Sequence, residues 1–223
     1  MLKKNEIKFA AQRAVSLVSK QNHPPIICAS MGRSGSTVLT LSIEKALRKS
    51  CFNSELPVFS RLGLFQTDLV GTTLPRNFVY KTHDFPRFIK DTKFIFIFGL
   101  ASDSVKSVLQ MGQTYGDKWL NAHLKHLHAN GPIENIIGED VLRLEEQVAR
   151  WTTFTESSVL CLRYDAIWDQ KDLVSEFVGM QVELPSKMPR SEKKIAPILS
   201  DKIKENYARL DAHIKSLPDA FLT

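Results

Sequence analysis

The sequence contains little cysteine and no cysteine motif. Its three cysteines are an odd number, and their spacing matches neither a metal site nor a redox pair. Cys28 and Cys161 lie within apolar, strand-like runs, where a thiol is typical of a small core residue. This cysteine usage fits a reducing compartment, and we expect a cytoplasmic protein.

Long apolar runs are also missing. No segment approaches the roughly 18 consecutive apolar residues of a membrane-spanning helix, so no membrane span is predicted. Residues 1–21 carry lysines but no apolar core followed by a small-residue cleavage site, which indicates no secretory signal. An amphipathic, basic targeting helix is an alternative for this stretch, but Glu6 and the modest arginine content favour a surface helix.

A basic tail is the third absence. The formal net charge of +6 is spread along the chain, which favours an anionic ligand without distinguishing nucleic acid from a nucleotide. The motifs described below favour the nucleotide, so we expect no nucleic-acid partner. With 223 residues, 43% of them hydrophobic and 24% charged, the chain suits one ordinary globular domain.

Apolar periodicity predicts strands that alternate with helices. Strands are expected near residues 26–30, 77–82, 93–98 and 158–163, and helices near residues 5–20, 37–50, 102–111, 139–156, 172–178 and 202–217. This order predicts an α/β fold with a three-layer parallel sheet flanked by helices. We expect one domain over 1–223, with an N-terminal helix in 1–22, a core over 26–179 and a C-terminal loop and helix over 180–223. The irregular segment 52–74 either covers a site or packs as a surface loop.

The stretch between the first core strand and the helix that follows it has the composition of an anion site. Two glycines let the backbone curve, three hydroxyls add donors and one arginine adds charge: Gly32, Gly35, Ser34, Ser36, Thr37 and Arg33. N–H groups at a helix start lack partners and lie at the positive end of the helix dipole. The sequence therefore predicts a phosphate-binding loop, with a tight serine-capped turn as the alternative.

Lys81 and His83 form a second polar cluster at the end of the next strand. Because they are two residues apart, their side chains are expected on the same side of the strand. Ligands of parallel sheets bind outside the carboxyl ends of the strands, where the phosphate loop also lies. An imidazole can take a proton from a hydroxyl, and a lysine can stabilise charge on a leaving phosphate. A core histidine beside a solvated lysine is the alternative.

These two segments resemble sulfotransferases. The loop is not a Walker A loop, because Ser36 stands where that motif has its lysine. The arrangement from Arg33 to Thr37 resembles instead the [RK]-S-G-[ST]-T loop of enzymes that use 3′-phosphoadenosine-5′-phosphosulfate (PAPS). The segment Lys81 to Pro86 resembles the K-[TV]-H-[LF]-P strand end of cytosolic-type sulfotransferases, with Asp84 where the family has an apolar residue.

The resemblance implies a role for each matching residue. Arg33, Ser34, Gly35, Ser36 and Thr37 would hold the 5′-phosphosulfate, and Arg33 would also act in catalysis. Lys81 would stabilise the bridging oxygen, and His83 would be the general base that deprotonates the acceptor.

Three later segments resemble the family more weakly. Asp103 and Ser107 match the motif that binds the 3′-phosphate of the cofactor, although Gly99 replaces its arginine. Tyr164 matches a strand end near the adenine, and Arg190 lies in a loose echo of a second 3′-phosphate clamp, for which a solvated loop is the alternative. The resemblance thus implies that Ser107, Tyr164 and Arg190 bind the cofactor.

The resemblance implies a P-loop-like sulfotransferase architecture. The expected reaction moves a sulfuryl group from PAPS to the hydroxyl or amine of a small-molecule or carbohydrate acceptor, without a metal. One alternative is a nucleotide-binding protein of this fold without transferase activity, because Gly99 and Val38 replace cofactor-binding residues of the family. Another is a P-loop-type small-molecule kinase, which would need a Walker lysine and a carboxylate for Mg²⁺. A metal bound by His123, His126 and His128 is a weaker alternative, because no cysteine or carboxylate completes the set.

Overall fold

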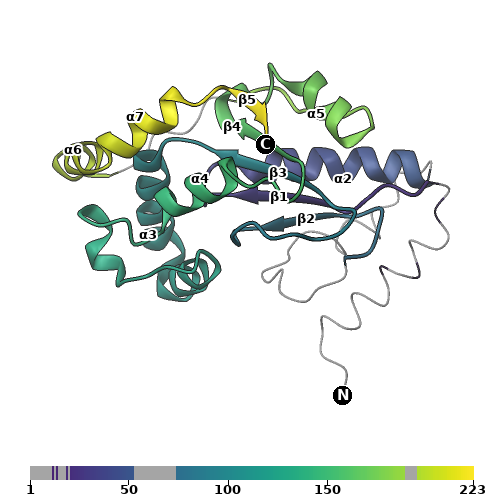
Figure 1. The fold of residues 1–223 in the computed structure, drawn as a ribbon. Helices are drawn as coiled ribbons and strands as arrows, with labels where there is room; N and C mark the ends of the chain where they lie inside the picture. The colour runs from purple at the N-terminus through teal and green to yellow at the C-terminus, as the bar shows by residue number, and fades with distance from the viewer. Residues whose placement is uncertain (1–11, 13, 15–18, 20, 53–73, 189–194) are drawn as a thin grey trace.

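Five strands form one sheet at the centre of the fold (Figure 1). The computed structural model describes residues 12, 14, 19, 21–52, 74–188 and 195–223. In spatial order the strands are β2 (Val79–Thr82), β1 (Ile26–Ser30), β3 (Lys93–Phe98), β4 (Val159–Arg163) and β5 (Ala220–Leu222). The first four pair in parallel, as predicted, and β5 pairs antiparallel with β4.

The strand register brings the predicted site residues to one edge of the sheet. Cys28 of β1 lies opposite Lys81 of β2, and Ser30, the last residue of β1, lies opposite Ile97 of β3. The carboxyl ends of β1, β2 and β3 therefore meet at the same edge. The chain leaves β1 there into the glycine-containing loop and leaves β2 there into His83.

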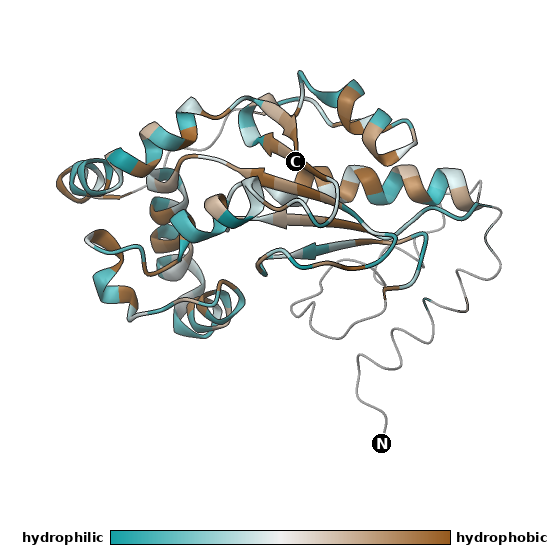
Figure 2. Cartoon of the chain, viewed as in Figure 1, coloured by the Kyte–Doolittle hydropathy of each residue, from teal (hydrophilic) through white to brown (hydrophobic). Residues whose placement is uncertain are grey.

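Helices cover both faces of the sheet. Helices α2 (Ser36–Phe52) and α5 (Lys171–Val178) pack on one face. The other face is covered by α3 (Ala101–His126), α4 (Leu144–Thr152), α6 (Pro197–Asn206) and α7 (Ala208–Ser216). Because both faces are covered, the central strands are apolar except at their ends, and Figure 2 shows them mostly in the hydrophobic colour.

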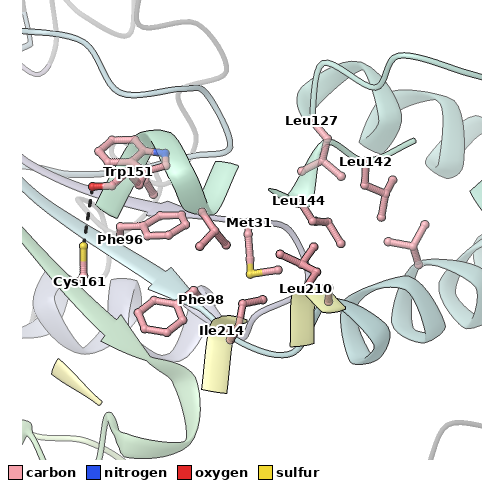
Figure 3. Close-up of a cluster of buried hydrophobic side chains, with 14 of the residues drawn as sticks. Met31, Phe96, Phe98, Leu127, Leu142, Leu144, Trp151, Cys161, Leu210 and Ile214 are labelled. Carbon is pink, nitrogen blue, oxygen red and sulfur yellow. Dashed lines mark hydrogen bonds between the residues drawn. The ribbon is translucent and has the colours of Figure 1, made fainter. Parts of the chain in front are cut away.

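Each face of the sheet carries its own hydrophobic core. The larger core, beneath α3, α4, α6 and α7, is rich in aromatic residues. Trp151 of α4 stacks on Phe96 of β3 with ring centroids 5.5 Å apart, and Met31 and Ile214 of α7 belong to the same cluster (Figure 3). The Cys161 thiol lies 3.8 Å from the Trp151 carbonyl oxygen. Met31 is the first residue after β1, so this core directly supports the start of the phosphate loop.

The predicted element boundaries were wrong in three places. The helix expected over 102–111 continues to residue 126, with a non-helical break at Gly116. The helix expected over 139–156 is confined to α4, and a 3₁₀ turn, η2 (Ile133–Ile137), precedes it. The single helix expected over 202–217 is the pair α6 and α7, and β5 was not predicted.

Some predictions lie outside the described residues. The helix over 5–20 falls mostly on residues that the structure does not describe, and the segment 53–73 falls there entirely. Arg190 is also among them, so its predicted contact with a cofactor stays a prediction.

Candidate functional site

The loop between β1 and α2 adopts a backbone suited to its glycines. Gly32 and Gly35 have positive φ angles of 74° and 78°, which glycine adopts without the steric cost of a Cβ atom. Arg33 between them also has a positive φ, of 51°. The loop therefore curls tightly before α2 begins at Ser36. The first N–H groups of α2 have no partners within the helix, and that of Val38 donates to the Gly35 carbonyl at 3.3 Å.

Hydrogen bonds from three hydroxyl groups hold this loop. The Ser34 hydroxyl donates to the Ile97 carbonyl at 2.9 Å, and the Ser104 hydroxyl of α3 donates to the Gly32 carbonyl at 3.1 Å. The Ser36 and Ser30 hydroxyl oxygens lie 3.0 Å apart. The Ser34 side chain thus ties the loop to β3, which leaves its backbone N–H as the group that an anion could bind.

Neighbouring side chains pack directly on both glycines. A Cβ atom at Gly35 would lie 2.0 Å from the Tyr164 ring, and one at Gly32 would lie 2.8 Å from a methyl group of Leu127. Side chains larger than hydrogen would therefore collide at both positions. Tyr164 follows β4 and Leu127 follows α3, so these contacts join the loop to two distant parts of the chain.

Lys81 reaches the start of α2 from β2. Its ammonium group donates to the Thr37 hydroxyl at 2.8 Å, and the residue is only 9% exposed. Burial, reinforced by the nearby Arg33, lowers the pKa of Lys81 to about 8. A buried lysine beside an arginine is destabilised as a cation, and a bound anion would relieve this cost.

His83 is oriented by the end of β1. Its Nδ1 lies 2.8 Å from the Ser30 carbonyl oxygen, which can only accept a hydrogen bond, so Nδ1 carries the proton. Nε2 of the neutral ring is then the nitrogen that can accept a proton from another molecule. Burial, together with the charges of Lys81 and Arg33, lowers the pKa of His83 to about 4, so the ring is neutral at physiological pH.

Helix α4 holds the backbone around His83. The Gln147 side-chain amide donates to the His83 carbonyl at 2.6 Å, and the Trp151 indole donates to the Asp84 carbonyl at 3.1 Å. The Asp84 carboxylate lies 2.8 Å from the His128 ring. Sequence reasoning missed Gln147, because one glutamine in an amphipathic helix carries no local signal of its long-range partner.

Arg33 and Ser107, which the resemblance assigns to different phosphates of the cofactor, lie together. The Arg33 Nε donates to the Ser107 hydroxyl at 3.0 Å, where the first turns of α3 approach the loop. Burial lowers the pKa of Arg33, which stays a cation at neutral pH. Gly99, which stands where the resemblance to sulfotransferases implies an arginine, is buried just after β3, and its N–H lies 3.3 Å from the Met31 sulfur.

A cavity of about 460 Å³ brings most of the predicted site residues together. Those on its wall are Arg33, Gly35, Ser36, Thr37, Lys81, His83, Ser107 and Tyr164. Ser34 is not on the wall, because its side chain turns toward β3. Asp103, Val38, Trp119, Ala122, His123 and His126 complete the lining. Arg33 and Lys81 contribute two cationic side chains to this space and Asp103 contributes one carboxylate, which favours an anionic ligand.

The three histidines considered for a metal do not act together. His123 and His126 line the cavity, whereas His128 pairs with Asp84 outside it. Within the described part of the chain, no group of three histidine, cysteine or acidic side chains is arranged to hold a metal ion.

A larger cavity of about 750 Å³ lies between α2 and the end of α5. Lys45, Lys49 and Arg48 contribute its basic lining, and the two lysines are exposed. None of the predicted site residues reaches it, so the smaller cavity is the candidate site.

No protein-family model and no curated protein matches this chain. None of the described helices combines the length and the apolar character that crossing a membrane requires. The functional argument therefore depends on the chemistry of the cavity.

Proposed function

We propose that the chain is a sulfotransferase that moves a sulfuryl group from PAPS to the hydroxyl or amine of an acceptor. The observation that carries the proposal is the joint lining of one cavity by a phosphate-type loop, a buried lysine and a histidine whose Nε2 is left to accept a proton. The resemblance of the same residues to sulfotransferase motifs supports it independently.

The residues present fit a phosphosulfate. The loop between Gly32 and Gly35 has the curvature of an anion cradle, and the N-terminus of α2 faces it. Arg33 contributes a guanidinium for phosphate oxygens, and Lys81 lies 2.8 Å from the Thr37 hydroxyl at the start of the same helix. The co-substrate supplies an activated sulfuryl group when bound.

The chain would then act mainly by positioning and charge stabilisation. Transfer breaks the bond between sulfur and the oxygen that bridges to the 5′-phosphate, and forms a bond from sulfur to the acceptor oxygen. Lys81 stabilises the charge left on the bridging oxygen, and His83 Nε2 takes the acceptor proton. Negative charge bound near Arg33 and Lys81 would offset two of the effects that depress the pKa of His83, which makes the imidazole a better base.

Nucleotide binding without transfer is the second candidate. Gly99 stands where the resemblance expects an arginine for the 3′-phosphate, and a neutral contact is weaker than a bidentate arginine. A kinase is less favoured, because the loop lacks the Walker lysine.

Calorimetric titration with adenosine 3′,5′-bisphosphate, adenosine 5′-phosphate and ATP tests the proposal. The bisphosphate should bind tighter than ATP, and Arg33→Ala should weaken its binding by about 10- to 150-fold, the value of a charge-assisted hydrogen bond. Arg209→Ala, a change at an exposed arginine on α7, serves as the matched control. Unchanged bisphosphate binding by the Arg33→Ala variant would show that the loop is not the anion site.

Transfer is tested with ³⁵S-labelled PAPS and a panel of hydroxyl and amine acceptors. Label in an acceptor supports the sulfotransferase. Tight bisphosphate binding without any labelled product across the panel would favour the second candidate.

A further inference from the structure

The larger cavity, of about 750 Å³, has no part in the proposed function. It lies between the second half of α2 and the residues just after α5, and it shares none of the described residues with the candidate site. Because a helix rises 1.5 Å per residue, Lys49 lies about 20 Å along α2 from Ser36 at the phosphate loop. Small-molecule sites typically measure about 300–1,000 Å³. The cavity therefore has the size to hold a ligand of its own.

Positive charge dominates the wall of this cavity. Lys45, Arg48 and Lys49 line it, and Glu183 contributes the one carboxylate among the described lining residues. The charge of Arg48 interacts with the buried Glu44 on the same helix. Lys45 and Lys49 are exposed, and neither forms an ion pair with any residue that the structure describes. These two lysines are the cations that a ligand can use.

The two lysines lie one helical turn apart on the same face of α2. Like charges at this spacing, with Cβ atoms about 5–6 Å apart, destabilise a helix. Lys49 lies in the last turn, where the helix dipole favours a cation, but Lys45 lies before that turn. The pair is thus unfavourable in the free protein, and an anion bound between the two ammonium groups would offset the repulsion.

Other groups beside the cavity add to the positive field. A Cβ atom at Gly179, on the cavity wall, would lie 4.0 Å from the Lys93 ammonium nitrogen. That ammonium donates to the Phe177 carbonyl at 2.6 Å, a neutral acceptor that does not cancel its charge. Ser50, also on the wall, lies 2.9 Å from the His23 ring. Burial and then neighbouring cations, Lys93 first among them, lower the pKa of His23, so the positive field reaches this wall.

We propose that this cavity binds a small molecule that carries two or more phosphate groups. A phosphate monoester has a charge of about −1.5 to −2 at neutral pH, which suits an uncompensated pair of cations. An ammonium group is a compact charge with three rotatable donors, so it binds phosphate without demanding one geometry. The spacing of Lys45 and Lys49 suits two anionic groups about one helical turn apart, and the cavity has room for the atoms that join them.

Tripolyphosphate and inorganic phosphate are the probes, because they differ in the number of linked anionic groups. In calorimetric titrations tripolyphosphate should bind the wild type, and more tightly than phosphate. The double variant Lys45→Gln with Lys49→Gln should bind it about 2- to 30-fold more weakly, the value of two exposed ion pairs. Glutamate at both positions should abolish binding. The control, Lys202→Gln with Lys215→Gln, removes the same charge from exposed positions on α6 and α7 and should bind like the wild type.

The titrations are repeated with saturating adenosine 3′,5′-bisphosphate, which should leave the affinity for tripolyphosphate unchanged. Full competition would place tripolyphosphate in the phosphate loop and would overturn the proposal. Absence of tripolyphosphate binding, or equal affinity in the wild type and the Lys45→Gln, Lys49→Gln protein, would overturn it as well. Glutamine forms helices about as well as lysine, so the melting temperature of this variant without ligand should match that of the wild type. Failure of the bisphosphate to bind would count against the sulfotransferase alone.

Discussion

His83 makes two kinds of contact just after β2, one through its ring and one through its backbone. Its Nδ1–H donates to the Ser30 carbonyl, while the carbonyl of the same residue accepts a hydrogen bond from Gln147. The first bond selects the tautomer and the second fixes the backbone. Under the proposed function, both serve to present Nε2 to an acceptor.

Replacement of His83 tests this role. His83→Ala should lower the turnover of PAPS-dependent transfer by about 10²- to 10⁴-fold, the usual contribution of a positioned proton acceptor. Bisphosphate affinity, measured by calorimetry, should stay close to that of the wild type, because the phosphate contacts come from other residues. His83→Asn repeats the test with a smaller change of volume.

The thermal stability of each variant is the necessary control. A folded His83→Ala protein with normal turnover would rule out the general base. If the variant fails to fold, His83→Asn decides the question, since its amide can still donate to Ser30 but is a very weak base.

Because the pKa of Lys81 is lowered, we expect anion binding to depend on pH. Its pKa of about 8 means that the cation is lost as the pH rises through 8, well before a solvated lysine near 10.5 would lose it. A bound phosphate favours the protonated form, so bisphosphate affinity should be highest below pH 8 and should fall by up to about tenfold per pH unit above it.

Calorimetry in buffers of different ionisation enthalpy should detect proton uptake on bisphosphate binding near pH 8. Lys81→Met should abolish this uptake and flatten the pH profile, whereas Lys215→Met, a change at an exposed lysine on α7, should not. Equal proton uptake by the Lys81→Met protein would assign the titrating group elsewhere.

At the scale of elements, α4 supports the end of β2 across the sheet face. Gln147 is fully buried and donates to the His83 carbonyl. Gln147→Leu should therefore lower the free energy of unfolding by about 1 kcal/mol, the net value of such a bond. It should lower turnover by more than this loss of stability explains, up to about 100-fold, because misplacement of a reacting group is costly.

The loss of stability and the loss of turnover can be measured separately. Urea denaturation reports the stability, and bisphosphate affinity should be unchanged while turnover falls. Gln113→Leu, at an exposed site on α3, provides the comparison. Stability lowered without any extra loss of turnover would mean that Gln147 is only a packing residue.

The boundaries of α3 and α4 show which features of the elements could be predicted from the sequence. The apolar stripes placed β1, β3 and β4 correctly, because buried parallel strands read as short apolar runs. The start of α4 was missed although Asp140 signals it, since its carboxylate oxygens accept the Leu144 and Glu145 N–H groups at 2.8 Å. The extent of α3 was missed because Gly112 and Gly116 lie near its middle, where glycine disfavours a helix.

In the candidate site, too, some residues could be predicted from the sequence and others could not. Arg33, Lys81 and His83 could be placed together from sequence, since the carboxyl ends of parallel strands meet at one edge. His123 and Gln147 could not, because a turn at Gly116 and a contact across the sheet face bring them there. Local patterns carry no information about such distant contacts.

At the scale of the whole molecule, the sheet separates two hydrophobic cores, and its strands contribute side chains to both. Cys28 and Cys161 lie on opposite faces, each fully buried, and burial raises the pKa of both thiols to about 12. Both are therefore protonated and shielded in the folded chain. This agrees with the prediction that they are small core residues.

Strand β5 covers an edge of the sheet that is exposed before folding is complete. Its residues lie along β4, and the Arg163 and Thr223 N–H groups extend the pairing with bonds of 2.8 and 3.1 Å to the Asp219 and Val159 carbonyls. Until this strand docks, one side of β4 presents a row of unpaired backbone groups beside apolar side chains. Such an edge recruits strands from other molecules. Docking of these three residues of antiparallel strand therefore covers the edge of β4 as the chain folds.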